Sequence, residues 1–153
     1  MTKAKIEIFE CAPSHFEKLA SIRHQLWPHE TVKEHLAEVQ DLLTNYDYHA
    51  WLAYDEKAEN KSPIGFMELS IRPYVNGCLY RPVAFLEGIY CHPDYQQQGI
   101  GTLFVEIAEI WARDRDIQEL ASDAYLENSL SHKAHARWGF AQTEKVVYFR
   151  KKL

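Results

Sequence analysis

The sequence has little cysteine, and what it has is scattered. The three cysteines are Cys11, Cys78 and Cys91. An odd number without a CxxC pair implies no disulfide framework and no CxxC site, and it favours a reducing cytoplasm. The N-terminus lacks a long apolar run, because residues 1–9 mix lysine and glutamate with apolar residues. We therefore expect no signal peptide, no membrane-spanning segment and no membrane partner.

Positive charge is also scarce. The chain has 17 Lys and Arg against 22 Asp and Glu, for a net charge of −5. This balance argues against nucleic acid as the main partner and suits a cationic small molecule. Repeats, low-complexity segments and linkers are lacking too, and 153 residues are enough to bury one core. We expect a single domain over residues 1–153.

Strand and helix patterns alternate along the chain. Ile6 and Ile8 alternate with a glutamate and predict a first strand. Capping-box patterns at Ser14–Glu17 and Thr31–Glu34 predict helices that run to about Trp27 and Leu43. The patterns that follow predict strands at 48–54, 64–71 and 83–91, a helix at 102–112, a strand at 119–122, a helix at 128–138, and strands at 140–143 and 145–149. The order βααβββαβαββ predicts an α/β fold, a mixed twisted sheet with helices on both faces.

The segment Gln96–Gly101 is the most informative part of the chain. It follows the apolar strand pattern of residues 83–91 and opens a helix. A strand, a glycine-bearing turn and a helix N-terminus together form an anion site, because backbone N–H groups and the helix dipole favour negative charge. The spacing Gln-x-x-Gly-x-Gly differs from G-x-G-x-x-G and lacks the Lys-Ser/Thr of a P-loop. The alternative interpretation is an ordinary helix entry with two glycines.

A second motif lies further along the chain. Asn128 opens a helix pattern that ends at Gly139, where a left-handed cap is expected, and Phe140 begins the next apolar stretch. Together the two motifs resemble the GCN5-related N-acetyltransferase superfamily (GNAT), which holds acetyl-CoA on such a loop.

Further segments narrow this resemblance. They are Tyr74–Gly77, Phe85–Tyr90, Ala121–Ala124, Ser131 and His132 with His135, and Thr143–Phe149. These segments resemble the aminoglycoside 6′-N-acetyltransferases, in the subgroup similar to the Acinetobacter and Salmonella chromosomal enzymes. The likeness runs from about Lys5 to Lys152 and is weakest between Pro28 and Pro63.

The resemblance implies acetyl-CoA as cosubstrate and no metal. The pantetheine arm of acetyl-CoA is expected in a gap beside the fourth strand, on the backbone of Gly88, Ile89 and Tyr90. The remaining implied cofactor-binding residues are Gln96, Gln97, Gln98, Gly99, Ile100, Gly101, Thr102, Asn128 and His135. Many relatives have Arg or Lys where this loop has glutamine, so a charge-assisted contact is lost here.

The resemblance also implies an acidic acceptor cleft. Glu87 and Asp123 would meet the reacting amine and take its proton, and Glu144 would add a second acidic contact, either within the chain or across a dimer interface. Trp27 and Tyr74 match aromatic positions that line the cleft. The residues alone leave alternatives: a solvent-facing Glu87 or Glu144, an Asp123 that caps a turn, and a Trp27 in the core.

His135 stands where the broad superfamily often has tyrosine, the proposed acid for the CoA thiolate. Histidine can donate a proton near neutral pH, or His135 only contacts the cofactor. Tyr148 is another possible acid, or a strand aromatic. His132 and His135 are spaced like a metal pair, but no third ligand is evident, so we expect no zinc.

We therefore expect an acyltransferase that acetylates the 6′-amine of aminoglycosides and so gives antibiotic resistance. The alternatives are an acetyltransferase for another small amine, such as a polyamine or metabolite, and a silent acyl-CoA-binding sensor. The resemblance also implies a homodimer that exchanges C-terminal strands, since residues 145–149 are strongly strand-forming. The alternative is that this strand folds back within one chain.

Overall fold

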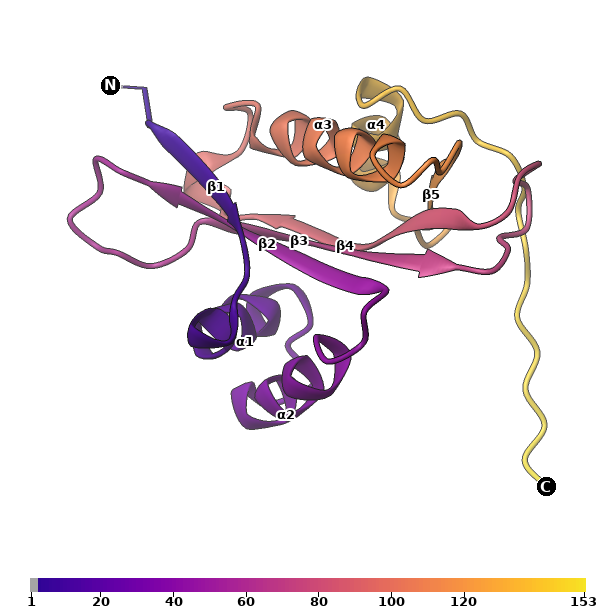
Figure 1. Cartoon of the computed structure of the whole chain (residues 1–153), viewed down its shortest axis with the longest axis horizontal. Coiled ribbons are helices and arrows are strands. Elements are labelled where there is room, and N and C mark those ends of the chain that lie inside the picture. The colour runs from indigo at the N-terminus through magenta and orange to yellow at the C-terminus, as the bar shows by residue number, and fades with distance from the viewer. Residues whose placement is uncertain (1–2) are drawn as a thin grey trace.

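The computed structural model describes residues 3–153 and contains one mixed five-stranded sheet. The strands lie side by side in chain order, and all neighbours are antiparallel except the parallel last pair. They are β1 (Ile6–Glu10), β2 (Tyr48–Asp55), β3 (Gly65–Arg72), β4 (Val83–Cys91) and β5 (Leu120–Ser122). One face is covered by α1 (Phe16–Leu26) and α2 (Val32–Leu42), and the other by α3 (Ile100–Arg113) and α4 (Ser129–Arg137) (Figure 1). The predicted fold class is confirmed.

Apolar side chains from both faces of the sheet form the core. In β2, Trp51 packs toward α3 and its neighbour Leu52 packs toward α1 and α2. In β3, Met67 and Phe66 divide in the same way. Strands buried on both faces read as continuous apolar runs. Among residues 3–153, no helix is long and apolar enough to cross a bilayer.

The two capping predictions have different outcomes. At α2, Thr31 Oγ1 accepts from the Glu34 amide at 3.2 Å, and the Thr31 amide donates to Glu34 Oε2 at 2.7 Å, so the capping box is confirmed. The Ser14 box is wrong, because a 3₁₀ turn at Pro13–His15 precedes α1 and contains Ser14. Proline favours the first position of a helical turn, and His15 Nδ1 accepts from the Ala12 amide at 2.9 Å instead.

The end of α4 matches its prediction. Gly139 is left-handed, with φ of 88°. Its amide donates to Ala136 O at 3.1 Å, and the Phe140 amide donates to His135 O at 3.0 Å. These two bonds form a Schellman cap, which sets the direction of the chain that follows.

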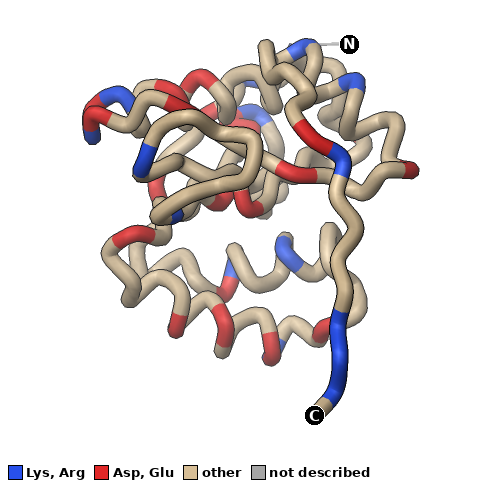
Figure 2. The backbone as a smooth tube through the Cα atoms, turned by 90° about the vertical axis from the view of Figure 1, so that its right-hand side faces the viewer, with Lys and Arg blue, Asp and Glu red and all other residues tan. Residues whose placement is uncertain are grey.

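The two C-terminal strands predicted at 140–143 and 145–149 are absent from this chain. Residues 141–153 are exposed, with Tyr148 83% and Phe149 92% accessible. This segment runs away from the sheet, past its β5 end (Figures 1 and 2). A strand requires a paired edge. The β5 edge at this side of the sheet has three residues, so the pattern predicted strand propensity but not its partner.

Candidate active site

A β-bulge in β4 lies at the centre of the candidate site. Gly88 is paired with Glu68 of β3, and Leu86 is paired with Leu69, which leaves Glu87 as an extra residue. The parallel partner β5 pairs only with residues 84–86 of β4. Beyond the bulge, β4 is therefore paired through β3 and separates from β5. The edge at Gly88, Ile89 and Tyr90 can receive an extended ligand as an added strand.

Glu87 is held by two residues of β3. Its Oε1 accepts from Ser70 Oγ at 2.5 Å, and Arg72 donates to both carboxylate oxygens at 2.9 Å. The Arg72 guanidinium also lies 3.5 Å from the centre of the Phe85 ring. The Glu87 side chain remains 23% exposed. Glu87 is thus neither a lone buried charge nor a free surface carboxylate.

Asp123 lies next to this bulge along the sheet. Ser122 of β5 is paired with Leu86 of β4 in parallel register, so Glu87 and Asp123 each follow the last paired residue of two adjacent strands. Asp123 is exposed. The sheet therefore brings these two predicted carboxylates to one place, at the carboxyl end where ligands collect in α/β folds.

His135 of α4 reaches this place through Ser122. Its Nδ1 lies 2.7 Å from Ser131 O and its Nε2 lies 2.7 Å from Ser122 Oγ. Because a carbonyl only accepts, Nδ1 carries the hydrogen and Nε2 accepts from the Ser122 hydroxyl. The ring packs between Trp138 and Phe140. Sequence reasoning missed Ser122, since a serine at a strand end carries no signal of its own.

The glycine loop has two left-handed residues, Gln97 and Gly99, with φ of 62° and 81°. The positive φ of Gly99 favours glycine. A Cβ there would meet no atom within 4 Å, so the space beside Gly99 is open. A Cβ on Gly101 would lie 2.6 Å from Trp138 Cζ2. Gly101 is thus small because α4 packs on α3. The first N–H groups of α3 remain available for an anion.

Other predicted cofactor residues have varied surroundings. Gln96 Nε2 donates to Cys91 O at 3.4 Å, and Gln98 Oε1 is buried without a hydrogen-bond partner within the described chain. Ile100 is a core residue, while Thr102 is exposed in the first turn of α3. Asn128 Oδ1 accepts from the Ser131 amide at 3.1 Å and so caps α4. Its side chain has a structural function already.

Of the other predicted acceptor residues, Trp27 is half-buried, whereas Tyr74 and Glu144 are exposed. Trp27 follows α1 and is half-buried, and a Cβ on Gly88 would lie 2.6 Å from its ring. The core and cleft interpretations of Trp27 are therefore compatible. Tyr74 is 61% exposed in the β3–β4 connection. Glu144 lies in the exposed C-terminal segment, next to Thr143, which packs on the Gly77 turn of that connection.

The cysteine near the site is a thiol and not a thiolate. Burial raises the pKa of Cys91, at the end of β4, to about 11. Burial likewise raises the pKa of Cys11 to about 12. Only the thiolate is an effective nucleophile, so a covalent acetyl-cysteine step at Cys91 is disfavoured near neutral pH.

The bulged β4, its separation from β5 and the left-handed loop before α3 define an acyl-CoA-dependent acetyltransferase fold. The chain belongs to the acetyltransferase (GNAT) family, which it matches over residues 13–140. Among curated proteins, it is 42% identical to aminoglycoside N(6′)-acetyltransferase type 1 of Acinetobacter baumannii, over 97% of this chain and 99% of that protein. It is 34% identical to the protein of the same name from Salmonella enteritidis, over 96% and 99%.

Solved structures agree. AAC(6′)-Iy in complex with a bisubstrate analogue, CoA-S-monomethyl-acetylneamine, has a TM-score of 0.90 and 34% identity, covering 98% of this chain and 100% of that one. The 6′-N-acetyltransferase AAC(6′)-Ih from Acinetobacter baumannii has a TM-score of 0.89 and 40% identity, covering 97% and 99%. The family resemblance found in the sequence is confirmed.

Proposed function

We propose that this protein transfers the acetyl group of acetyl-CoA to the 6′-amine of aminoglycosides and thereby gives antibiotic resistance. The observation that carries the proposal is the placement of two carboxylates, Glu87 and Asp123, where β4 and β5 separate. An acidic pair suits a polycationic acceptor. The relatives named above, similar over nearly the whole chain, support the same acceptor.

The proposed cosubstrate site uses mainly backbone. The arm of acetyl-CoA would pair with Gly88, Ile89 and Tyr90, and the pyrophosphate would bind the loop at residues 96–102. The open space at Gly99 and the free N–H groups of α3 fit that anion. The glutamine-rich loop supplies no charge of its own, so helix N-terminus and dipole carry the attraction.

The proposed reaction is direct transfer. The neutral amine attacks the thioester carbonyl, the C–N bond forms, the C–S bond breaks, and its electron pair goes to sulfur. Asp123 takes the amine proton, because it is exposed and unlike Glu87 has no ion pair in the described chain. Glu87 holds positive charge of the acceptor nearby. This assignment makes Asp123 the base and Glu87 an electrostatic contact.

The leaving thiolate needs a proton. We assign it to Ser122, whose hydroxyl donates to His135 in the resting structure and can turn toward the sulfur. The step requires His135 as the imidazolium: its Nε2 proton passes to Ser122 Oγ while the Ser122 hydroxyl proton passes to sulfur. His135 is then neutral, with its Nδ1 hydrogen held by Ser131 O, and regains the Nε2 proton from solvent. His135 thus acts through Ser122 and not by direct contact.

A homodimer is the proposed assembly. Val147, Tyr148 and Phe149 are 76%, 83% and 92% exposed, and a strand-forming apolar segment gains stability by pairing with a second copy. The exchange would bring Glu144 to an acceptor cleft.

A cytoplasmic location is also proposed, with no nucleic-acid or membrane partner, because acetyl-CoA and free thiols are typical of that compartment.

An acceptor screen tests the function. Release of free CoA is measured with aminoglycosides, with polyamines and without acceptor. We expect rapid release with aminoglycosides bearing a 6′-amine and little with the others. Faster turnover of a polyamine would support the alternative acceptor class, and CoA binding without release would indicate a sensor.

A further inference from the structure

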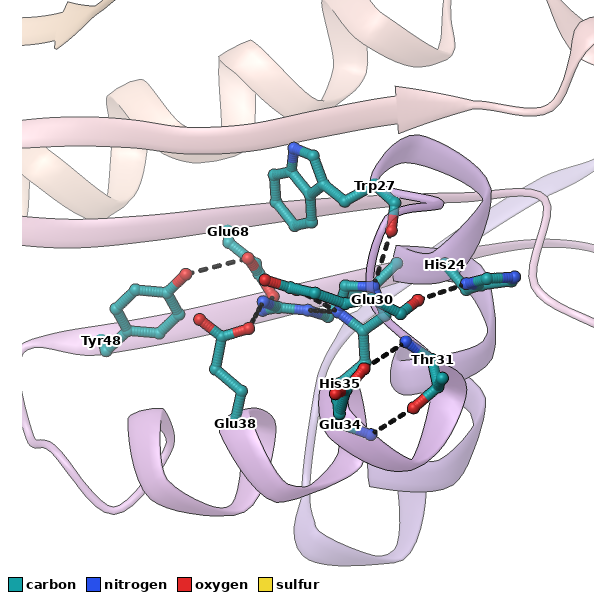
Figure 3. Close-up of polar contacts among 10 residues, drawn as sticks. His24, Trp27, Glu30, Thr31, Glu34, His35, Glu38, Tyr48 and Glu68 are labelled. Carbon is teal, nitrogen blue, oxygen red and sulfur yellow. Dashed lines mark hydrogen bonds and ion pairs between the residues drawn. The ribbon is translucent and has the colours of Figure 1, made fainter.

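A buried polar network lies between the sheet and the helices α1 and α2 (Figure 3). The Arg23 guanidinium donates to Glu68 Oε1 and to Glu38 Oε2, both at 2.5 Å. Glu68 also accepts from Tyr48 at 2.8 Å. The network joins α1, α2, β2 and β3. Arg23 and Glu68 have side chains only 4% and 1% exposed.

Stability alone does not account for this network. A buried ion pair is often no more stable than apolar residues of the same volume, but it fixes geometry when every group has a partner. Here the fixed geometry adjoins the site. Glu68 is paired with Gly88 at the bulge, and the Trp27 ring packs against Gly88.

His35 links the network to Trp27. The His35 side chain is fully buried, its Nδ1 lies 3.3 Å from Arg23 Nε, and its Nε2 lies 2.9 Å from Trp27 O. Arg23 can only donate and the carbonyl can only accept, so Nδ1 accepts and Nε2 donates. The Glu30 carboxylate is farther from Nδ1, at 3.5 Å. Both ring nitrogens are therefore engaged.

Trp27 is fixed from two sides by these contacts. It caps α1, where carbonyl groups lack helical partners, and His35 supplies the hydrogen bond to its carbonyl. Arg23 lies 4.9 Å from the centre of the Trp27 ring, within cation–π range. The backbone is thus held by His35, and the ring is held by Arg23 and Gly88.

We propose that His35 is a positioning residue for the acceptor cleft, acting through Trp27. The inference rests on the proposed function, since it assigns Trp27 to that cleft. It gives the buried histidine a kinetic consequence: losing its Nε2 donor loosens Trp27 and weakens acceptor binding, while the cosubstrate loop, on the opposite side of β4, is unaffected.

Two substitutions separate the halves of the imidazole. Asparagine at position 35 retains an acceptor for Arg23 but is too short to reach Trp27 O. Glutamine extends its amide N–H to the place of Nε2. We expect His35→Asn to raise the acceptor KM about tenfold, the equivalent of one buried hydrogen bond. The acetyl-CoA KM should rise much less, because Trp27 touches the proposed pantetheine edge only at Gly88. His35→Gln should restore most of the acceptor affinity.

A matched control and a second readout complete the test. His49→Asn removes a histidine hydrogen-bonded to Glu10 on the β1–β2 side and should leave both KM values unchanged. Fluorine NMR of 5-fluorotryptophan protein reports on Trp27 without any acceptor, with its resonance assigned by Trp27→Phe. It should shift in His35→Asn and return in His35→Gln.

An unshifted Trp27 resonance, or equal rises in both KM values, would overturn the positioning role. If His35→Asn does not fold, Arg23→Lys replaces it, because lysine keeps the charge beside Glu68 but lacks the Nε–H that Arg23 donates to His35. An unchanged acceptor KM in folded Arg23→Lys would then overturn the proposal. Failure of the proposed function is distinct: the wild-type protein would acetylate no aminoglycoside, whatever the Trp27 resonance does.

Discussion

At the scale of single residues, the two carboxylates of the site differ in their hydrogen-bonding partners. Glu87 accepts from Ser70 and Arg72 on β3, whereas Asp123 is exposed after β5. The sequence indicated both residues but not this difference. A partner such as Arg72, which is paired with Val83 on the neighbouring strand, depends on register, which no local pattern contains.

Asp123→Asn tests the assignment of the base. The amide can still contact the acceptor but cannot take a proton, so we expect turnover to fall on the order of 10²–10⁴-fold, with acetyl-CoA affinity unchanged. Steady-state kinetics and calorimetry measure the two effects. Turnover near the wild-type value would move the base to Glu87 or to water.

Cys91→Ser tests direct transfer. Because burial raises the pKa of Cys91 to about 11, the thiol is protonated at neutral pH and should alkylate slowly with iodoacetamide at pH 8. We expect the serine variant to retain turnover within about threefold, since no covalent step uses this sulfur. An acetylated Cys91 peptide, trapped without acceptor and found by mass spectrometry, would contradict this.

At the scale of secondary-structure elements, hydrophobic periodicity together with capping and turn residues predicted most of the fold. The Thr31 capping box, the strand patterns of β2 to β4 and the Gly139 cap all have local causes. The bulge at Glu87 has none, because it arises from a shift in pairing between β3 and β4. The Ser14 box failed because Pro13 starts helical backbone earlier.

Substitutions of the two loop glycines should have different effects, one on CoA binding and the other on stability. Gly99→Glu places a side chain and a negative charge in open space beside the α3 N-terminus, so CoA binding should be lost while the fold persists. Gly101→Ala instead meets Trp138 at 2.6 Å and should lower stability by about 1–3 kcal/mol. Calorimetry with CoA and thermal unfolding distinguish them. Unchanged CoA binding in folded Gly99→Glu would place the pyrophosphate elsewhere.

At the scale of the whole molecule, the C-terminal segment is the part of the fold that does not pack on the sheet. Its apolar residues are exposed in the single chain, although their sequence is strongly strand-forming. The sequence could not reveal this, because strand propensity says nothing about which edge, in this copy or another, provides the partner.

Sedimentation at micromolar concentration tests the assembly. We expect a dimer for the full chain and a monomer after truncation at residue 142, because the truncation removes the exposed strand-forming segment while leaving the sheet of residues 6–122 intact. A full-length monomer would remove the exchange and any contribution of Glu144 to a neighbouring cleft.

The proposed reaction is acetyl transfer to a 6′-amine at the place where β4 and β5 separate. The most direct measurement compares free CoA release with kanamycin, which bears a 6′-amine, and with an analogue that has a 6′-hydroxyl in its place. We expect efficient turnover of the amine and little of the hydroxyl analogue. Equal turnover of the two would contradict it and move the reaction to another amine.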